Sequence, residues 1–170
     1  DFRLLVGQMT DYGPTGGWSS PAPVAGELKT EKGCLHYEYG TPMYMQGMID
    51  QDTLAEIMDN CNEWLGNAAA TLLKNHEWDF FISHEHTQDF LWHAVMTDMD
   101  STDGATRTKA WDTVRKALQS NDRYVAKIVE AAGPDALVIL VSAHGAVPDG
   151  PMFDPYLALE PAGLTVRKSS

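Results

Sequence analysis

The feature that most limits what this chain can fold into is an unbroken apolar run at residues 136–141. Its Val and Ile side chains are β-branched, which favours an extended backbone. A strand that is covered on both faces needs apolar side chains at successive positions, and this run has them. Residues 78–83 form a second run of similar character, richer in aromatic side chains. The two runs predict buried strands of a mostly parallel sheet.

Helical periodicity marks the segments around these runs. Apolar side chains recur at helical spacing over residues 50–76 and 106–132, and residues 88–99 fit a shorter helix. Asp50 is suited to cap the first of these helices at its N-terminus. Gly133, which is followed by proline, ends the last one. These patterns predict three helices that flank the sheet.

Glycine and proline interrupt the chain repeatedly between about residues 7 and 47, so we expect a long irregular region there. A short strand is expected before it, at residues 2–6, and a short helix at residues 156–159. The order strand, irregular region, helix, strand, two helices, strand predicts an α/β fold with crossover connections. Residues 1–170 fit a single α/β domain. Because the sequence starts with a strand-like segment and without Met, we expect this domain to be incomplete.

The acidic composition restricts the partners of the chain. Its net charge is −12 and its pI is near 4.7. This charge argues against nonspecific binding to nucleic-acid polymers and to membrane surfaces, which favour basic patches. A phosphate-bearing substrate would need metal ions to supply positive charge locally. No apolar run reaches the ~20 residues that span a bilayer, and no secretory leader is recognisable. These features slightly favour the cytoplasm, but the sequence leaves the compartment unknown.

Two predicted strands end in turns that carry histidine. Asp89 and His93 follow the first strand at the i, i+4 spacing that places both side chains on one face of a helix. A carboxylate and an imidazole in this arrangement can bind one divalent cation, and zinc accepts both ligand types. His144 follows the second strand, and parallel neighbours would bring both turns to one edge of the sheet. The alternatives are an Asp at a helix N-terminus with a His packed beside Trp92, and a His144 that only hydrogen-bonds at the end of its strand.

Other polar clusters are weaker candidates. His84 and His86 lie two residues apart, and we expect one of them to orient a ligand or contact substrate while the other is solvated. Asp98, Asp100 and Asp103 form an acidic loop without the spacing of an EF-hand, so we expect a solvated loop.

Signatures of nucleophilic catalysis and of cysteine chemistry are weak in the sequence. No nucleophile elbow, P-loop or dinucleotide fingerprint occurs. Ser142 lies too close to His144 in the sequence to suggest a triad. Cys34 and Cys61 fit no zinc motif, and we expect reduced thiols more than a disulfide. The catalytic residue is therefore unknown from the sequence.

The order of these features resembles the alkaline phosphatase superfamily. The resemblance rests on the Trp-Asp-apolar run at residues 78–82, the motif Asp89-x-x-x-His93, a long helix, and an apolar strand that ends in Ser142-Ala143-His144-Gly145. It covers about residues 78–164, and the most similar branch is the type I phosphodiesterase/nucleotide pyrophosphatase group. It implies part of a three-layer α/β/α fold, two divalent metal ions (zinc, or alternatively manganese) and a small phosphate-ester substrate.

Carried over by position, the resemblance assigns Asp89 and His93 to the first metal ion and His144 to the second. Ala143 stands where the family has a metal-binding Asp. The family's Ser or Thr nucleophile, with a further Asp ligand, belongs to an N-terminal part that this sequence does not match. The resemblance therefore implies a metal-dependent phosphoric ester hydrolase, of which this chain holds part of the two-metal site.

Two alternatives to that function remain open. Ala143 is compatible with a catalytically impaired homologue that keeps a binding or structural role. A sulfatase-like or phosphoglycerate-mutase-like relative would use the same scaffold for another transferred group. Under each of them, few strands are present to flank residues 137–141, so we expect exposed sheet edges and self-association.

Overall fold

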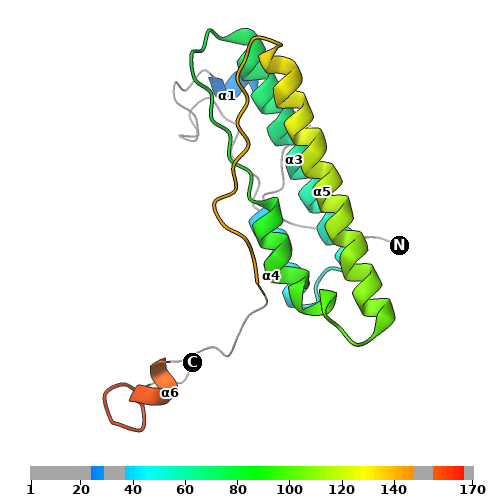
Figure 1. Ribbon diagram of the computed structural model, residues 1–170. Coiled ribbons are helices and arrows are strands. Elements are labelled where there is room, and N and C mark those ends of the chain that lie inside the picture. Colours follow the sequence, from blue (N-terminus) through cyan, green and yellow to red (C-terminus); the bar gives the residue numbers. More distant parts are fainter. Residues whose placement is uncertain (1–23, 29–36, 148–154, 167–170) are drawn as a thin grey trace.

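The computed structural model describes residues 24–28, 37–147 and 155–166, and these residues fold as helices joined by extended segments (Figure 1). The predicted strand at residues 2–6 and Cys34 lie outside the described residues. Two helices fall within the region for which we expected irregular structure. The helices are α1 (Val24–Glu27), α2 (Tyr37–Met45), α3 (Gln51–Asn75), α4 (Thr87–Met99), α5 (Gly104–Ala132) and α6 (Pro155–Leu159).

The helices α3, α4 and α5 begin and end close to where the sequence predicts. Asp50 caps α3, because its side chain accepts a hydrogen bond of 2.8 Å from the backbone N–H of Thr53. Asp103 caps α5 in the same way, with a bond of 2.8 Å from the N–H of Thr106. Gly133 ends α5 with φ of 83°, a conformation that favours glycine. The acidic loop before α5 was expected to be solvated only, whereas its Asp103 also starts this helix.

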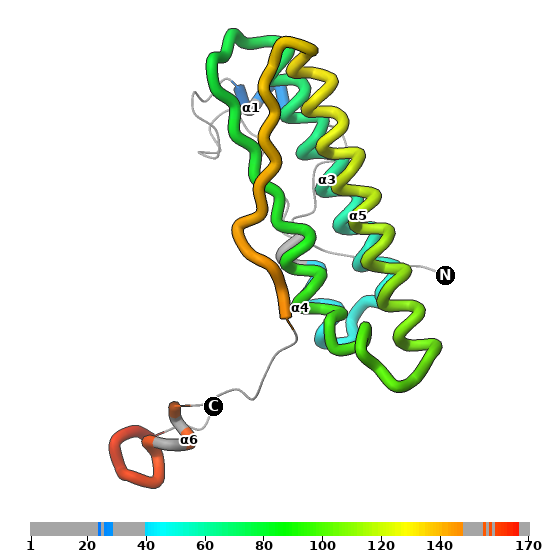
Figure 2. Tube along the Cα trace, in the orientation of Figure 1, coloured from blue at the N-terminus to red at the C-terminus, as the bar shows by residue number. Residues whose placement is uncertain are grey.

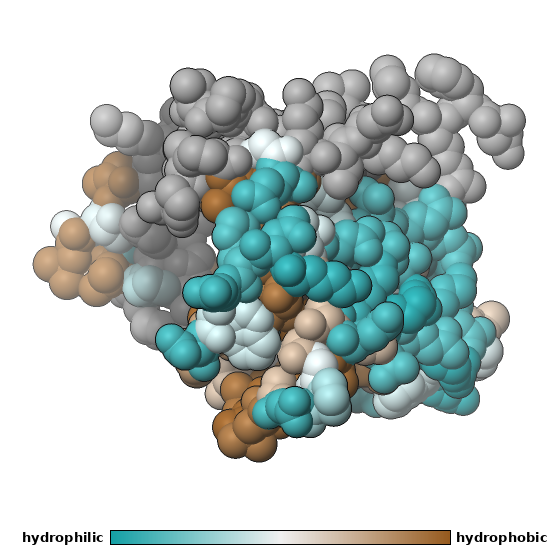
Figure 3. All heavy atoms as spheres, turned by 90° about the horizontal axis from the view of Figure 1, so that it is seen from above, coloured by the Kyte–Doolittle hydropathy of each residue, from teal (hydrophilic) through white to brown (hydrophobic). Residues whose placement is uncertain are grey.

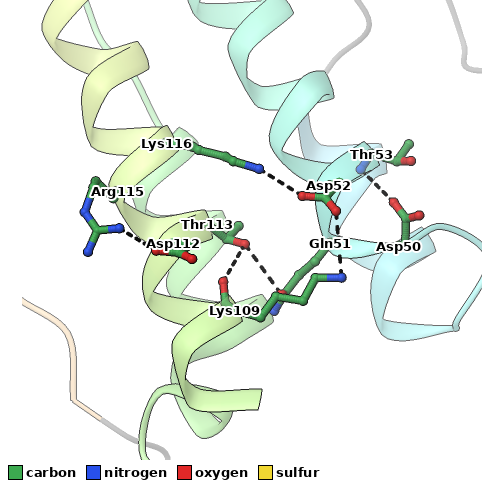
Figure 4. A network of polar contacts seen from close by, with 9 residues as sticks. All are labelled: Asp50, Gln51, Asp52, Thr53, Lys109, Asp112, Thr113, Arg115 and Lys116. Atoms are coloured by element: carbon green, nitrogen blue, oxygen red, sulfur yellow. Dashed lines mark hydrogen bonds and ion pairs between the residues drawn. The ribbon is translucent and has the colours of Figure 1, made fainter. Parts of the chain in front are cut away.

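The two long helices α3 and α5 lie side by side and run in the same direction (Figure 1). Ion pairs fix their register, because three acidic residues of α3 each pair with the basic residue 64 positions later in α5. The three pairs are Asp52–Lys116, Asp59–Arg123 and Glu63–Lys127, with N···O distances of 2.9, 2.5 and 2.5 Å. At one end of this helix pair, Lys109 also forms an ion pair with Asp52, and the hydroxyl of Thr113 donates a hydrogen bond to Gln51 (Figure 4).

The hydrophobic core lies where α4 packs against the α3–α5 pair. Helix α2 closes one side, where a Cβ added at Gly40 would lie 3.2 Å from the Cδ1 atom of Leu54. Hydrophilic residues cover much of the described surface on the face seen in Figure 3. The buried residues of the core cluster come from α3, α4 and α5; they are Leu54, Met58, Leu91, Val95, Met99, Ala110, Val114 and Ala117.

A buried polar network joins the start of α4 to both long helices. Asn62 of α3 donates hydrogen bonds to the Oγ atom of Ser120 at 3.1 Å and to the Oδ1 atom of Asn121 at 2.6 Å. The hydroxyl of Thr87, in the first turn of α4, donates to the Oδ1 atom of Asn62 at 3.0 Å. Asn62, Thr87 and Ser120 are all buried. Because buried polar groups are costly unless they are paired, this network fixes where α4 begins.

The predicted α/β fold with a mostly parallel sheet is wrong for the described residues, which contain helices and no strand. Residues 78–82 and 137–141 are extended, yet no backbone–backbone hydrogen bond among the described residues involves either run. Their side chains are also exposed, with Phe80 at 82% and Leu137 at 86%. The composition of these runs suits a strand, but a sheet also needs neighbouring segments that pair with it. Neither run has such a partner among the described residues, so apolar content alone did not produce a sheet.

Each of the two extended segments leads back along the bundle after a long helix (Figure 2). The first follows α3 and leads into α4, and the second follows α5. The hydroxyl groups of Ser83 and Tyr124 contact each other at 2.5 Å and tie the first segment to α5. The Nε1–H of Trp78 donates to the carbonyl oxygen of Leu73 at 3.3 Å. In the view of Figure 2 both segments run down the same side of the helices.

Acid should weaken the pairing of α3 with α5. Burial alone would raise the pKa of Asp59, but hydrogen bonds from Ser120 and Arg123 outweigh it and hold this pKa below its ordinary value. A carboxylate whose pKa is lower in the folded than in the unfolded protein stabilises the fold at pH values above its unfolded pKa, which is about 3.9 for Asp. This contribution is lost as the pH falls through the pKa of the folded state. Urea unfolding at a series of pH values should therefore show a smaller acid-induced loss for Asp59→Asn than for the wild type.

The control for this measurement is Asp122→Asn, which changes an exposed carboxylate of α5. It should keep the pH dependence of the wild type. An Asp59→Asn variant with the same pH dependence as the wild type would contradict the role of this ion pair.

Candidate metal centre

Asp89 lies in the first turn of α4, and local contacts fix its position. Thr87, two residues earlier, is fully buried and bonded to Asn62. The Glu85 carboxylate accepts a short hydrogen bond from the backbone N–H of Thr87. A carboxylate in the first turn is favoured by the positive end of the helix dipole. The side chain of Asp89 is 27% exposed, so it remains accessible to an ion or a ligand.

Three imidazoles surround this carboxylate. The Nε2 atom of His86 lies 3.4 Å from the Oδ2 atom of Asp89. The Nε2 atom of His93, one turn further along α4, lies 3.8 Å from the Oδ1 atom. The Nε2 atom of His144 lies 4.0 Å from the same Oδ1 atom. Residues from two distant segments therefore meet at one carboxylate, although the sheet expected to bring them together is absent from the described residues.

The backbone contact of His144 defines which of its ring nitrogens carries the proton. Its Nδ1 atom lies 2.9 Å from the carbonyl oxygen of Gly145. A carbonyl oxygen can only accept, so this hydrogen bond requires a proton on Nδ1. In the neutral ring the Nε2 atom, which lies 4.0 Å from the Oδ1 atom of Asp89, is then the nitrogen with the lone pair. The hydroxyl of Ser142 donates to the carbonyl oxygen of His144 at 2.6 Å and supports this turn.

His86 is the residue that the sequence patterns underweighted. Its position three residues before Asp89 is the signal that places it beside the carboxylate. Its ring also packs edge-on against Phe90, with a centroid distance of 5.2 Å, and contacts His84 at 5.0 Å. His93 and His144 are more open, each with 62% of the side chain exposed. The cluster is therefore half enclosed, with His86 on its inner side.

The donor atoms stand farther apart than the ligands of one bound ion. Neighbouring donors around a tetrahedral zinc are about 3.3 Å apart, given metal–ligand bonds of about 2.0 Å. The corresponding separations from Asp89 to His93 and His144 are 3.8 and 4.0 Å. Accordingly, within the described part of the chain no group of three or more His, Cys, Asp or Glu side chains is already arranged to hold a metal ion. These two separations exceed that value by about 0.5 and 0.7 Å, so side chains would have to move before one ion could be bound.

A hollow on the described surface is lined by none of the residues of this cluster. It has a volume of about 690 Å³ and is lined mostly by polar residues of α5, including Lys109, Arg115 and Lys116. The charged groups of its wall pair with one another, as Lys109 and Lys116 do with Asp52 (Figure 4). Its basic side chains are therefore already engaged, and we assign it no ligand.

Further features bear on the expected partners. Cys61 is buried in α3. Among the helices of the described residues, none is long and apolar enough to cross a membrane.

Comparison with protein-family models, with curated proteins and with solved structures finds no match to this chain.

Proposed function

We propose that this chain carries part of the metal site of a metal-dependent phosphoric ester hydrolase. Asp89, His93 and His144 would hold one divalent cation, for which zinc fits the donor set best. The observation that carries this proposal is the meeting of His93 and His144, from different segments, at the Oδ1 atom of Asp89. The sequence resemblance assigns the same three residues to two ions, whereas this geometry favours one ion shared by all three.

The donor set suits a catalytic ion better than a structural one. Three protein ligands leave the fourth position of zinc open for a water molecule or a phosphate oxygen. Such an ion would act as a Lewis acid on a phosphoryl oxygen. It would also provide the positive charge that an anionic substrate needs in a protein of net charge −12.

The residues of the chain have separable roles in this proposal. Asp89 provides the negative charge that balances the cation, and its position is fixed by the buried start of α4. The hydrogen bond from Nδ1 of His144 to Gly145 holds the ring so that Nε2 can bind the ion. His86 contacts the other oxygen of Asp89 and orients the carboxylate. Partners of this kind typically change metal affinity by about 10- to 100-fold.

Zinc titration with a chromophoric competitor tests the proposed site. We expect one ion per chain, and we expect Asp89→Asn and His144→Ala each to weaken binding by at least about tenfold. His86→Ala should weaken it less than either of these. The matched control is His76→Ala, since this exposed imidazole at the end of α3 pairs with Glu27 instead. Binding that is equally tight in Asp89→Asn and in the wild type would rule out the proposed ligands.

A catalytically impaired homologue with a binding role is the second candidate, and Ala143 is the observation that favours it. Ala143 removes a carboxylate next to His144 and with it one anionic ligand. The same titration with Ala143→Asp separates the two candidates when it is combined with an assay on a chromogenic phosphodiester. Turnover by the wild-type chain supports the hydrolase, whereas tighter zinc binding and turnover that appear only in Ala143→Asp favour the impaired homologue.

A further inference from the structure

Three methionines lie close together at the end of α2 and in the turn that follows it: Met43, Met45 and Met48. Methionine is among the residues that folded proteins most often bury. Here the side chains of Met45 and Met48 are 66% and 65% exposed, and that of Met43 is half-buried. These side chains therefore gain little from apolar burial, and their thioether groups are open to a ligand.

The backbone of this turn brings the methionines together. The N–H of Gly47 donates to the carbonyl oxygen of Tyr44 at 2.9 Å, and the N–H of Met48 donates to that of Met43 at 2.9 Å. With Gly47 at φ of 71°, these two bonds form a Schellman motif. In this motif the residues at the positions of Met43 and Met48 commonly contact each other. Met45 is the last residue of α2, so all three side chains start from one turn of the chain.

Contacts with the core hold this turn in place. Tyr44 and Ile49 are partly buried and pack against the core cluster. The hydroxyl of Tyr44 also donates to the Oδ2 atom of Asp98 in α4, at 3.5 Å. The backbone that carries the methionines is therefore anchored, whereas their side chains have three rotatable bonds and can adjust to a common ligand. An anchored backbone lowers the entropy that binding would cost.

The chemistry of thioether sulfur identifies the ligand as a soft cation. Thioethers are soft donors, and Cu(I) is the ion that such donors select. Zinc is bound by thiolate, imidazole and carboxylate groups, and calcium and magnesium are bound by oxygen. The position also suits a cation, because a helix carries partial negative charge at its C-terminal end and α2 has no basic residue in its last turn. The net charge of −12 adds to this attraction.

We propose that Met43, Met45 and Met48 bind one Cu(I) ion. Thioethers carry no proton, so this binding releases none, unlike the binding of a metal ion by protonated imidazoles. The site shares no residue with the proposed zinc centre and does not depend on it. The other use of exposed methionines is an adaptable apolar contact with another protein, which would need no metal ion.

Methyl NMR of protein that is isotope-labelled at its methionine methyl groups tests the site directly. A Cys34→Ser background removes a competing thiol, and Cys61 is buried. Under anaerobic conditions with ascorbate, Cu(I) should shift the methyl signals of Met43, Met45 and Met48, whereas Zn(II) at the same concentration should not. Replacing each of these methionines by leucine in turn assigns the signals. Signals that stay unmoved at saturating Cu(I), or that shift equally with both ions, would overturn the proposal.

Competition with bicinchoninate, a chromophoric chelator of Cu(I), measures the affinity in the same background. The triple variant Met43→Leu, Met45→Leu, Met48→Leu should lose the binding, because leucine has a similar volume but no sulfur. The matched control is Met58→Leu, which changes a fully buried methionine of α3 and should bind Cu(I) as the wild type does. Circular dichroism should show the same helix content in all of these proteins. Equal affinity in the triple variant and the wild type would overturn the proposal and favour an apolar contact surface.

Discussion

Replacing Leu91 by alanine should lower the free energy of unfolding by about 2–5 kcal/mol. Leu91 is fully buried on α4 and belongs to the cluster that α4 forms with α3 and α5. Its truncation removes buried apolar surface and leaves a cavity that rigid neighbours fill only in part. Because α4 is short, it depends on this packing more than on its own helix propensity. Urea unfolding followed by circular dichroism measures the change.

The control for this experiment is Leu118→Ala on α5. Leu118 is 52% exposed, so its truncation should change stability by less than about 0.5 kcal/mol. Equal losses in the two variants would mean that α4 is not packed as described.

Replacing Asn62 by alanine should cost about 2–3 kcal/mol, although alanine is the better helix former. The substitution removes the hydrogen-bond partner of Thr87 and one partner each of Ser120 and Asn121, in a buried position. Polar groups left unpaired away from water lose most of their solvation without compensation. The same unfolding experiment tests this loss.

Asn67→Ala is the matched control, because Asn67 is on the same helix and also hydrogen-bonds, to Glu63 and Lys127, but is exposed. It should have almost no effect, since water replaces the lost contacts. Since Thr87 lies two residues before Asp89, Asn62→Ala should also weaken zinc binding, whereas Asn67→Ala should not. If both variants were equally stable, the buried network would not hold α4 in place.

The helices were predictable because their signals are local. Apolar periodicity and two end signals, Asp50 and Gly133, placed α3 and α5 within about two residues of their described ends. The short helix expected near residues 156–159 is also present, as α6. Asp103 was the exception, because an acidic loop and a helix cap use the same residue types.

The sheet was not predictable because strand pairing is a non-local property. Residues 137–141 have the composition of a buried strand, but composition does not provide the neighbouring strands. A segment that is apolar on both faces needs partners on both edges and layers above and below it. Within the described residues these are missing, so the run stays extended and exposed.

The candidate site was predictable in its residues but not in its geometry. The i, i+4 spacing identifies Asp89 and His93, since helical residues at that spacing share a face. His144 was singled out because it follows the second predicted strand, but the sheet expected to bring it to Asp89 is absent from the described residues, so its approach to the same oxygen atom could not be inferred. His86 was underweighted although its spacing of three residues from Asp89 is a local signal, because it lies just before α4 and not within the helix.

The length of the extended segment after α5 determines whether His144 can reach Asp89. The segment from Gly133 to His144 returns along the bundle as a single extended tether, with its far end at Asp89 (Figure 2). An extended chain advances about 3.3 Å per residue, so a loss of two residues from this tether would withdraw His144 by roughly 6–7 Å. That displacement exceeds the 4.0 Å that now separates His144 from Asp89. The number of residues in the tether therefore matters to the cluster, as does the identity of its ligands.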